Sequence, residues 1–118
     1  MIELPFPPSA NRYWRTTVRG SRPVTYKSND ARVYLKDVAA RCMVDRVRPL
    51  DGPVAVDIVA HFPTKAGDLD NILKVLLDSL EGFFYQDDKQ VHHITAVRQL
   101  DREHPRVEVS VFPLEEVA

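Results

Sequence analysis

Residues 67–82 read GDLDNILKVLLDSLEG and contain the clearest element of the chain. Apolar side chains recur there at the spacing that places them along one face of a helix. They are Leu69, Ile72, Leu73, Leu76, Leu77 and Leu80. Gly82 follows, and glycine is the usual residue just beyond a helix end. The spacing therefore predicts an amphipathic helix over about 69–81.

Strand patterns stand on both sides of this helix. Between Pro53 and Pro63 the residues alternate as those of a strand do, and one of the two faces is wholly apolar. Two more strands are predicted near 91–100 and 106–112. Residues 2–6 predict a short first strand, which the prolines around its end stop or confine to the edge of a sheet.

A second helix is predicted near 29–46. Ser28 and Asn29 are good N-cap residues, and Ala31, Leu35, Val38 and Cys42 then recur at helical spacing. Residues 9–27 are polar and basic, and we interpret them as a loop or a loose hairpin.

The order of these elements is strand, loop, helix, strand, helix, strand, strand. It predicts an α+β protein in which two main helices pack on a mixed β-sheet. The chain has 118 residues, of which 44% are hydrophobic and 28% charged, and it contains no repeat or long linker. We therefore expect a single domain over 1–118.

The composition also bounds the compartment. Cys42 is the single cysteine, so an intrachain disulfide and a thiolate zinc site are excluded. No apolar run approaches the ~20 residues that a membrane span needs. The first residues lack the basic region and apolar stretch of a signal peptide. We therefore expect a cytoplasmic protein with no membrane partner.

Charge is distributed unevenly along the chain. The net charge is −1, yet residues 1–46 carry nine Lys and Arg against four acids, and residues 47–118 carry seven against thirteen. Such asymmetry can place a phosphate-binding surface beside a cluster of carboxylates. The alternative is that these charges only form solvated faces.

Asp68 and Asp70 lie at the start of the predicted central helix, and Lys74 follows Asp70 on the same face. Two carboxylates this close repel each other unless a cation lies between them, and hard oxygen ligands suit Mg²⁺. The alternative is structural, because an Asp is also a favoured N-cap and complements the helix dipole.

A second acidic pair, Asp87-Asp88, follows three aromatic residues. It forms either a solvated turn or a third metal ligand that the fold brings alongside Asp68 and Asp70. The stretch from Asp68 to Leu73 is also similar to the nucleophile motif of haloacid-dehalogenase-type phosphatases, so a small phosphatase with an aspartate nucleophile is an alternative. Its context differs, because that motif follows a buried strand directly in a larger domain.

Three stretches, taken together, resemble a known family. Residues 4–15, LPFPPSANRYWR, are rich in proline and continue into Asn-Arg-aromatic. Residues 68–74, DLDNILK, are followed by Asp78-Ser79-Leu80, and residues 87–91, DDKQV, form an acidic turn before a strand. In this order and at this spacing they resemble the RusA family of Holliday junction resolvases, which phages and prophages commonly encode.

The resemblance implies a homodimeric endonuclease that cuts two opposed strands of a four-way DNA junction and leaves ligatable nicks. It implies one or two Mg²⁺ ions per active site, held by Asp68, Asp70 and Asp88, with Lys74 supporting catalysis. The choice between Asp87 and Asp88 stays open.

Residues expected to contact the DNA are mainly basic and lie mostly in the N-terminal half. They are Asn11, Arg12, Arg15, Arg19, Lys27 and Lys65. Phosphate contacts of this kind give position along the DNA without reading its sequence. A further alternative is a non-catalytic module that binds DNA structures, with its acids serving only as caps and turn residues.

Overall fold

The computed structural model describes residues 1–114, so the end of the predicted domain lies outside the described residues. The strands are β1 (Ile2–Pro5), β2 (Trp14–Arg19), β3 (Arg22–Lys27), β4 (Val54–Phe62), β5 (Val91–Leu100) and β6 (Arg106–Pro113). The helices are α1 (Ala10–Tyr13), α2 (Asn29–Val44), α3 (Leu69–Leu80) and the short 3₁₀ helix η1 (Asp88–Gln90). Among residues 1–114, no helix has the length and apolar character needed to cross a bilayer.

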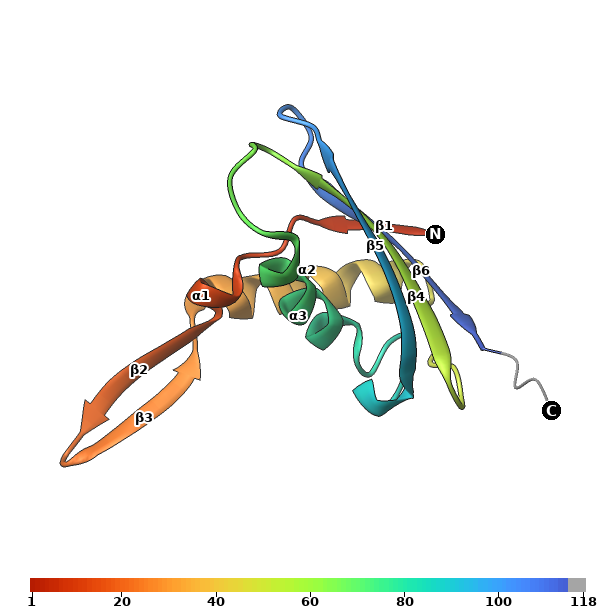
Figure 1. The fold of residues 1–118 in the computed structure, drawn as a ribbon. Helices are drawn as coiled ribbons and strands as arrows, with labels where there is room; N and C mark the ends of the chain where they lie inside the picture. The colour runs from red at the N-terminus through yellow and green to blue at the C-terminus, as the bar shows by residue number, and fades with distance from the viewer. Residues whose placement is uncertain (115–118) are drawn as a thin grey trace.

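Four strands form one mixed sheet in the order β1-β6-β4-β5, and α2 and α3 lie on the same side of it (Figure 1). β4 pairs parallel with β5 and antiparallel with β6. This is the predicted α+β architecture with two main helices on a mixed sheet. β1 is an edge strand, as its prolines predict, and β5 forms the other edge.

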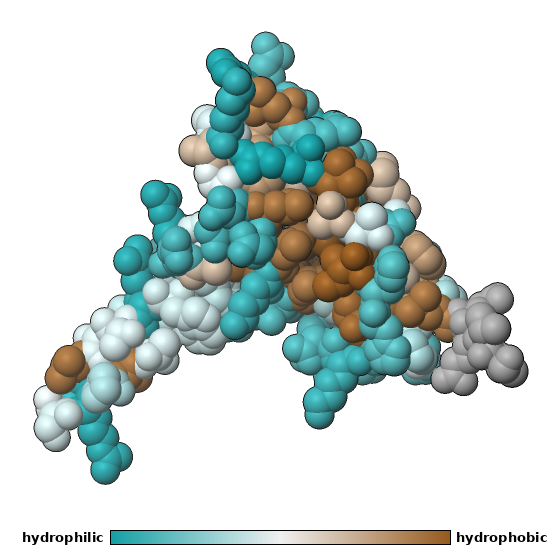
Figure 2. Space-filling view, in the orientation of Figure 1, coloured by the Kyte–Doolittle hydropathy of each residue, from teal (hydrophilic) through white to brown (hydrophobic). Residues whose placement is uncertain are grey.

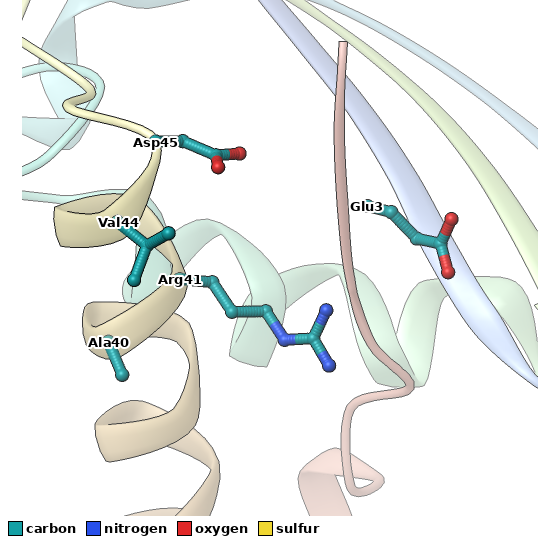
Figure 3. A pocket seen from close by; sticks show the side chains of 5 residues that line it. All are labelled: Glu3, Ala40, Arg41, Val44 and Asp45. Carbon is teal, nitrogen blue, oxygen red and sulfur yellow. The ribbon is translucent and has the colours of Figure 1, made fainter.

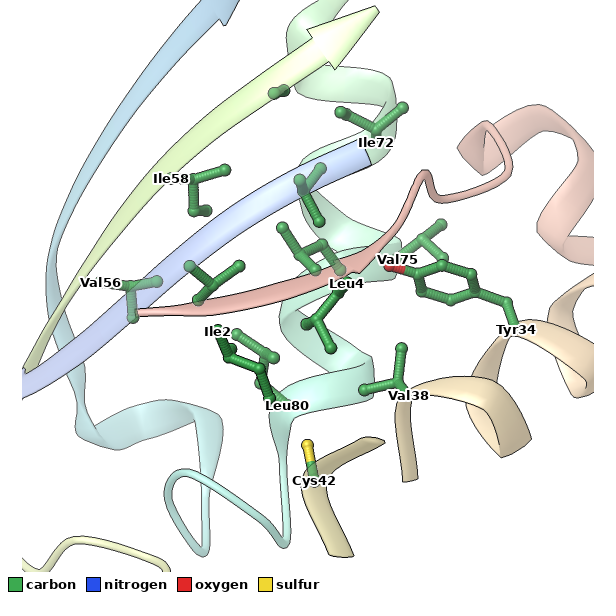
Figure 4. Close-up of a cluster of buried hydrophobic side chains, with 14 of the residues drawn as sticks. Ile2, Leu4, Tyr34, Val38, Cys42, Val56, Ile58, Ile72, Val75 and Leu80 are labelled. Carbon is green, nitrogen blue, oxygen red and sulfur yellow. The ribbon is translucent and has the colours of Figure 1, made fainter. Parts of the chain in front are cut away.

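The core lies between the sheet and the two helices (Figure 4). The apolar face predicted for β4 is confirmed, since every member of it is buried. Those members are Val54, Val56, Ile58, Ala60 and Phe62. Alternate residues of a strand point to the same side, so this face meets the helices.

α3 is rotated relative to the predicted stripe. Its most deeply buried positions include Val75, Leu76 and Leu80, whereas Leu73 and Leu77 are less buried. Leu77 lines an open groove together with Val91 and Ile94 of the edge strand β5, so the flank of α3 toward β5 is only partly covered. A strip of apolar surface is therefore left beside α3.

α2 begins as predicted and ends two residues early. The Ser28 hydroxyl accepts a hydrogen bond from the Ala31 N–H at 3.2 Å, which caps the helix. The helix ends at Val44 rather than at 46 because Arg46 adopts a left-handed conformation, with φ of 55°. Cys42 is buried in the core, and burial raises the pKa of its thiol to about 11.

Residues 9–27, expected as a loop or loose hairpin, form α1 and a regular hairpin of β2 and β3. Gly20 takes a φ of 65° at the first position of the two-residue turn, which a side chain would disfavour. The hairpin extends away from the body of the molecule, and nearly all of its residues are exposed (Figure 1).

Candidate active site

The N-terminal end of α3 presents two carboxylates. Asp68 occupies the N-cap position, but its side chain accepts no capping hydrogen bond. Asp70 lies in the first turn and is exposed, as Asp68 is. The helix dipole favours negative charge at this end. Because the Asp68 carboxylate is not used as a cap, its oxygens are available to a ligand.

Lys74 follows Asp70 by one turn of α3 and is exposed. Among residues 1–114, its ammonium group forms no ion pair with either Asp70 or Asp78. A surface pair of this kind would be worth only about 0.3–0.5 kcal/mol. The lysine is therefore free to face a ligand that approaches α3.

The two acids of the second pair, Asp87 and Asp88, have different surroundings. Asp87 caps η1: its carboxylate accepts a hydrogen bond from the Lys89 N–H at 2.9 Å, and its own N–H donates to Gln90 Oε1 at 3.0 Å. The hydrogen bond from the Lys89 backbone holds the pKa of Asp87 below its ordinary value. Asp88 lines a neighbouring groove instead. This division favours Asp88 over Asp87 as the acid that meets a ligand.

The groove beside α3 has a volume of about 370 Å³. Its lining residues are Lys74, Leu77, Asp78, Asp88, Val91 and Ile94. The fold thus brings Asp88 to Lys74 and to a further carboxylate, Asp78. It does not bring Asp88 to the pair of acids at the start of α3.

The topology explains this separation. β4, α3 and β5 form a strand-helix-strand unit with parallel strands, so α3 runs back along the sheet. Asp68 precedes the helix, whereas Asp88 follows it and lines the groove beside the middle and last part of α3. The 12 residues of α3 span about 18 Å at ~1.5 Å per residue. Within the described part of the chain, no three His, Cys, Asp or Glu residues are close enough to share a metal ion.

Asp78 was given no role in the sequence analysis. Its signal was present, because Asp70, Lys74 and Asp78 follow one another at four-residue spacing along one side of α3. In the structure the Tyr13 hydroxyl is buried with no hydrogen-bond partner among the described residues. Its pKa is raised to about 12, first by burial and then by the charge of Asp78. Asp78 thus has a protonated phenol on one side and the groove on the other.

The exposed carboxylates of the candidate site suit a hard divalent cation. The carboxylates of Asp68, Asp70 and Asp88 are exposed oxygen ligands. A small cation such as Mg²⁺ needs only one or two of them, because water and substrate phosphate oxygens complete its shell. The residues present therefore fit a metal ion, while the assignment of particular ligands remains a prediction.

The basic residues predicted to hold DNA lie, with one exception, on one continuous part of the chain, which starts at α1 beside α3 and continues along the projecting hairpin. Asn11 and Arg12 belong to α1, Arg15 and Arg19 to β2, and Lys27 ends β3. Lys65 is separate and lies in the loop that leads into α3. All are exposed except Lys27, which is half-buried with its Nζ 5.7 Å from the centre of the Tyr13 ring.

One face of the hairpin forms a second groove, of about 470 Å³, against α2. Its lining residues are Thr17, Arg19, Val24, Tyr26 and Arg32. Among residues 1–114, neither of its two arginines forms an ion pair. Free guanidinium groups beside an exposed tyrosine form a surface that suits phosphates and bases. Arg19 is among the residues that the sequence predicts to contact DNA, whereas Arg32 is not, because only the fold brings α2 to the hairpin.

Another hollow lies between the end of α2 and β1 (Figure 3). It is lined by Glu3, Ala40, Arg41, Val44 and Asp45. It contains none of the predicted site residues, and mixed charges line it, so it does not belong to the candidate active site.

Comparison with known proteins identifies the class. A family model described as "Endodeoxyribonuclease RusA" matches residues 5–112. A crossover junction endodeoxyribonuclease of Enterobacteria phage HK97 is 38% identical over 120 residues, covering 97% of this chain and 94% of the relative. Relatives of the same name from Escherichia coli K12 and Enterobacteria phage 82 are each 33% identical, over 93% of this chain and 91% of the relative.

The chain is therefore an endodeoxyribonuclease, the class that its exposed carboxylates and basic hairpin suit. It belongs to the RusA family. Nucleases of this kind generally hydrolyse phosphodiesters with the help of a divalent metal ion.

Proposed function

We propose that residues 1–118 form one RusA-like domain that resolves four-way DNA junctions in recombination and repair, acting in the cytoplasm. The products are symmetric paired nicks that a ligase can seal. The observation that carries the proposal is the set of free carboxylates along α3, with Lys74 between them, in a chain of this family.

Asp68, Asp70 and Asp88 are the proposed ligands of one or two Mg²⁺ ions. When bound, Mg²⁺ lowers the pKa of a water molecule and polarises the scissile phosphate. Lys74 lies one turn beyond Asp70 with its ammonium group free, so we assign it to the negative charge that builds on the phosphate.

The DNA arms contact the basic residues of α1 and the hairpin, and Lys65 beside the site. Asn11, Arg12 and Arg15 lie nearest the body, and Arg19 lines the hairpin groove together with Arg32. These contacts are made to DNA phosphates, so they depend on the shape of the junction and not on its base sequence.

The proposed homodimer forms through the free edge of β5 and the flank of α3. On the side of β5 that faces the helices, Ile94 and Leu100 are 43% and 47% exposed, and Val97, on the opposite face of the sheet, is 47% exposed. Figure 2 shows hydrophobic side chains gathered where α3 and β5 lie in Figure 1. A ten-residue edge strand that carries exposed apolar side chains is a template for pairing with another chain. A two-fold dimer also gives one active site for each strand cut.

Such a dimer could bring Asp88 of one chain close to Asp68 and Asp70 of the other. Ile94 belongs both to the exposed edge and to the groove that contains Asp88. If the two-fold axis passes beside α3 and runs perpendicular to it, the two copies of the helix run in opposite directions. The Asp68–Asp70 end of the second copy then lies toward Asp88 of the first, and each active site draws ligands from both chains.

The proposal is tested with Asp70→Asn, which keeps the shape of the side chain and removes its charge. We expect junction cleavage to fall by about two orders of magnitude or more, since even outer-shell changes at metal sites cost 10–100-fold. Junction binding, measured by gel shift in Ca²⁺, should stay intact. The matched control is Asp30→Asn, an exposed acid in the first turn of α2. Full activity in Asp70→Asn would refute the metal role.

A further inference from the structure

Arg98 lies on the side of β5 that faces the helices, in register with Ala60 of β4. Its neighbours on that side of the strand, Ala96 and Leu100, are apolar. A half-buried charge among such residues needs partners. The Arg98 guanidinium lies over the Phe62 ring, with its central carbon 3.9 Å from the ring centre, which is a close cation–π contact.

The same guanidinium donates hydrogen bonds to the loop that joins β4 to α3. One terminal nitrogen contacts the carbonyl oxygen of Gly67. The other contacts the carbonyl oxygens of Ala66 at 3.1 Å and of Thr64 at 3.2 Å. Three carbonyls of one short loop thus point at a single side chain, which lies more than 30 residues later in the sequence.

The bond to Gly67 matters most for the site. The Gly67 carbonyl belongs to the peptide group that leads directly into Asp68, so its hydrogen bond to Arg98 fixes the plane of that peptide. Gly67 itself has a φ of 84°, a conformation that L side chains rarely adopt. The entry of the chain into α3 is therefore set by a special backbone turn and by one guanidinium.

We propose that Arg98 is a positioning residue for the nuclease reaction: it holds the loop 64–67 so that Asp68 meets the metal ion in the correct orientation. The inference rests on the proposed function in taking Asp68 as a ligand. Asp68 cannot orient itself through a cap, because its side chain accepts no capping hydrogen bond. The planar fork of an arginine can serve three acceptors in fixed directions, which the single ammonium of a lysine does less well.

The test compares Arg98→Lys and Arg98→Met with the control Arg102→Met. Arg102 lies in the exposed turn after β5. We expect Arg98→Met to raise the Mg²⁺ concentration for half-maximal junction cleavage by about tenfold or more, the usual effect of removing an outer partner of a metal site. Arg98→Lys keeps the charge over Phe62 and should fall between Met and wild type. Arg102→Met should match wild type.

A second readout uses the metal-free protein. Backbone ¹⁵N relaxation should show residues 64–68 gaining motion in both Arg98 variants, with Mn²⁺ binding without DNA weakened in parallel. A merely structural role would change neither the metal requirement nor the order of this loop in a variant that folds. Should Arg98→Met not fold, Arg98→Lys and the relaxation data decide alone.

Two results would overturn the inference: a folded Arg98 variant with wild-type metal requirement and loop order, or one that changes only KM for the junction, as a DNA contact does. Failure of the proposed function looks different, because the wild-type protein itself would then show no Mg²⁺-dependent cleavage.

Discussion

Single residues at this site differ in whether their polar groups are already used. Asp87 engages its carboxylate with the backbone of η1, whereas Asp68 stands at an N-cap position without capping anything. Two acids that look alike in sequence therefore have different roles. Hydrogen bonds of this kind could not be predicted from spacing, because they depend on the turn that the chain adopts.

Variants of Asp87 and Asp88 test which of these two neighbouring acids is needed for cleavage. We expect Asp88→Asn to abolish junction cleavage without lowering the melting temperature. Asp87→Ala should lower the melting temperature, because η1 loses its cap, and should reduce cleavage much less. Cleavage assays and thermal unfolding followed by circular dichroism check both. The reverse pattern would make Asp87 the functional acid.

Asp101 gives a prediction for pH. Its carboxylate accepts hydrogen bonds from the Arg106 guanidinium and from the backbone N–H groups of His104 and Glu103, and these contacts, Arg106 first, hold its pKa below the ordinary 3.8. A lowered folded pKa stabilises the fold above the unfolded value, and this stabilisation is lost as pH falls through the folded pKa. Asp101→Asn should therefore be less stable than wild type in urea at pH 7, with the difference shrinking below pH 3.8. A constant difference would contradict this.

Among the elements, α3 and the hairpin carry the site between them. α3 is anchored by residues that are wholly buried, Val75, Leu76 and Leu80, so its polar side is held in place against the sheet. The hairpin has almost no such anchor and projects outward. A rigid helix suits the placement of ligands, and a projecting arm suits contact with a large substrate.

The hairpin groove predicts how binding depends on salt. Arg19→Gln and Arg32→Gln should each weaken junction binding, and removal of one phosphate contact should reduce the slope of log K against log salt by about 1. Fluorescence anisotropy at several salt concentrations measures this, with Arg102→Gln as the control. Unchanged slopes would place the DNA elsewhere on the protein.

At the scale of the whole molecule, the parallel pairing of β4 with β5 decides where the acids lie. The sequence predicted α3 and β4 well, because periodicity reports which residues are buried. It did not decide between a loop and a hairpin for residues 9–27, although Gly20-Ser21 between two runs of strand-forming residues is a hairpin signal. It could not place Asp88 relative to Asp68, since that distance depends on the crossover between two strands that are separated by a helix.

A dimer with shared active sites predicts rescue between inactive chains. Asp70→Asn and Asp88→Asn should each be inactive alone. When the two are mixed and allowed to exchange, each heterodimer has one site with both changes and one site with neither, so single-strand nicking of the junction should return. A mixture that exchanges chains and stays inactive would show that each site lies within one chain.

The most direct test of the central claim follows both strands of a labelled four-way junction on a denaturing gel, with and without Mg²⁺, beside a linear duplex of the same sequence. We predict symmetric nicks on two opposed strands of the junction, only with Mg²⁺, that a ligase reseals. Absence of Mg²⁺-dependent nicking would contradict the account, whether the protein then only binds the junction or instead hydrolyses a small phosphate ester through an aspartyl-phosphate.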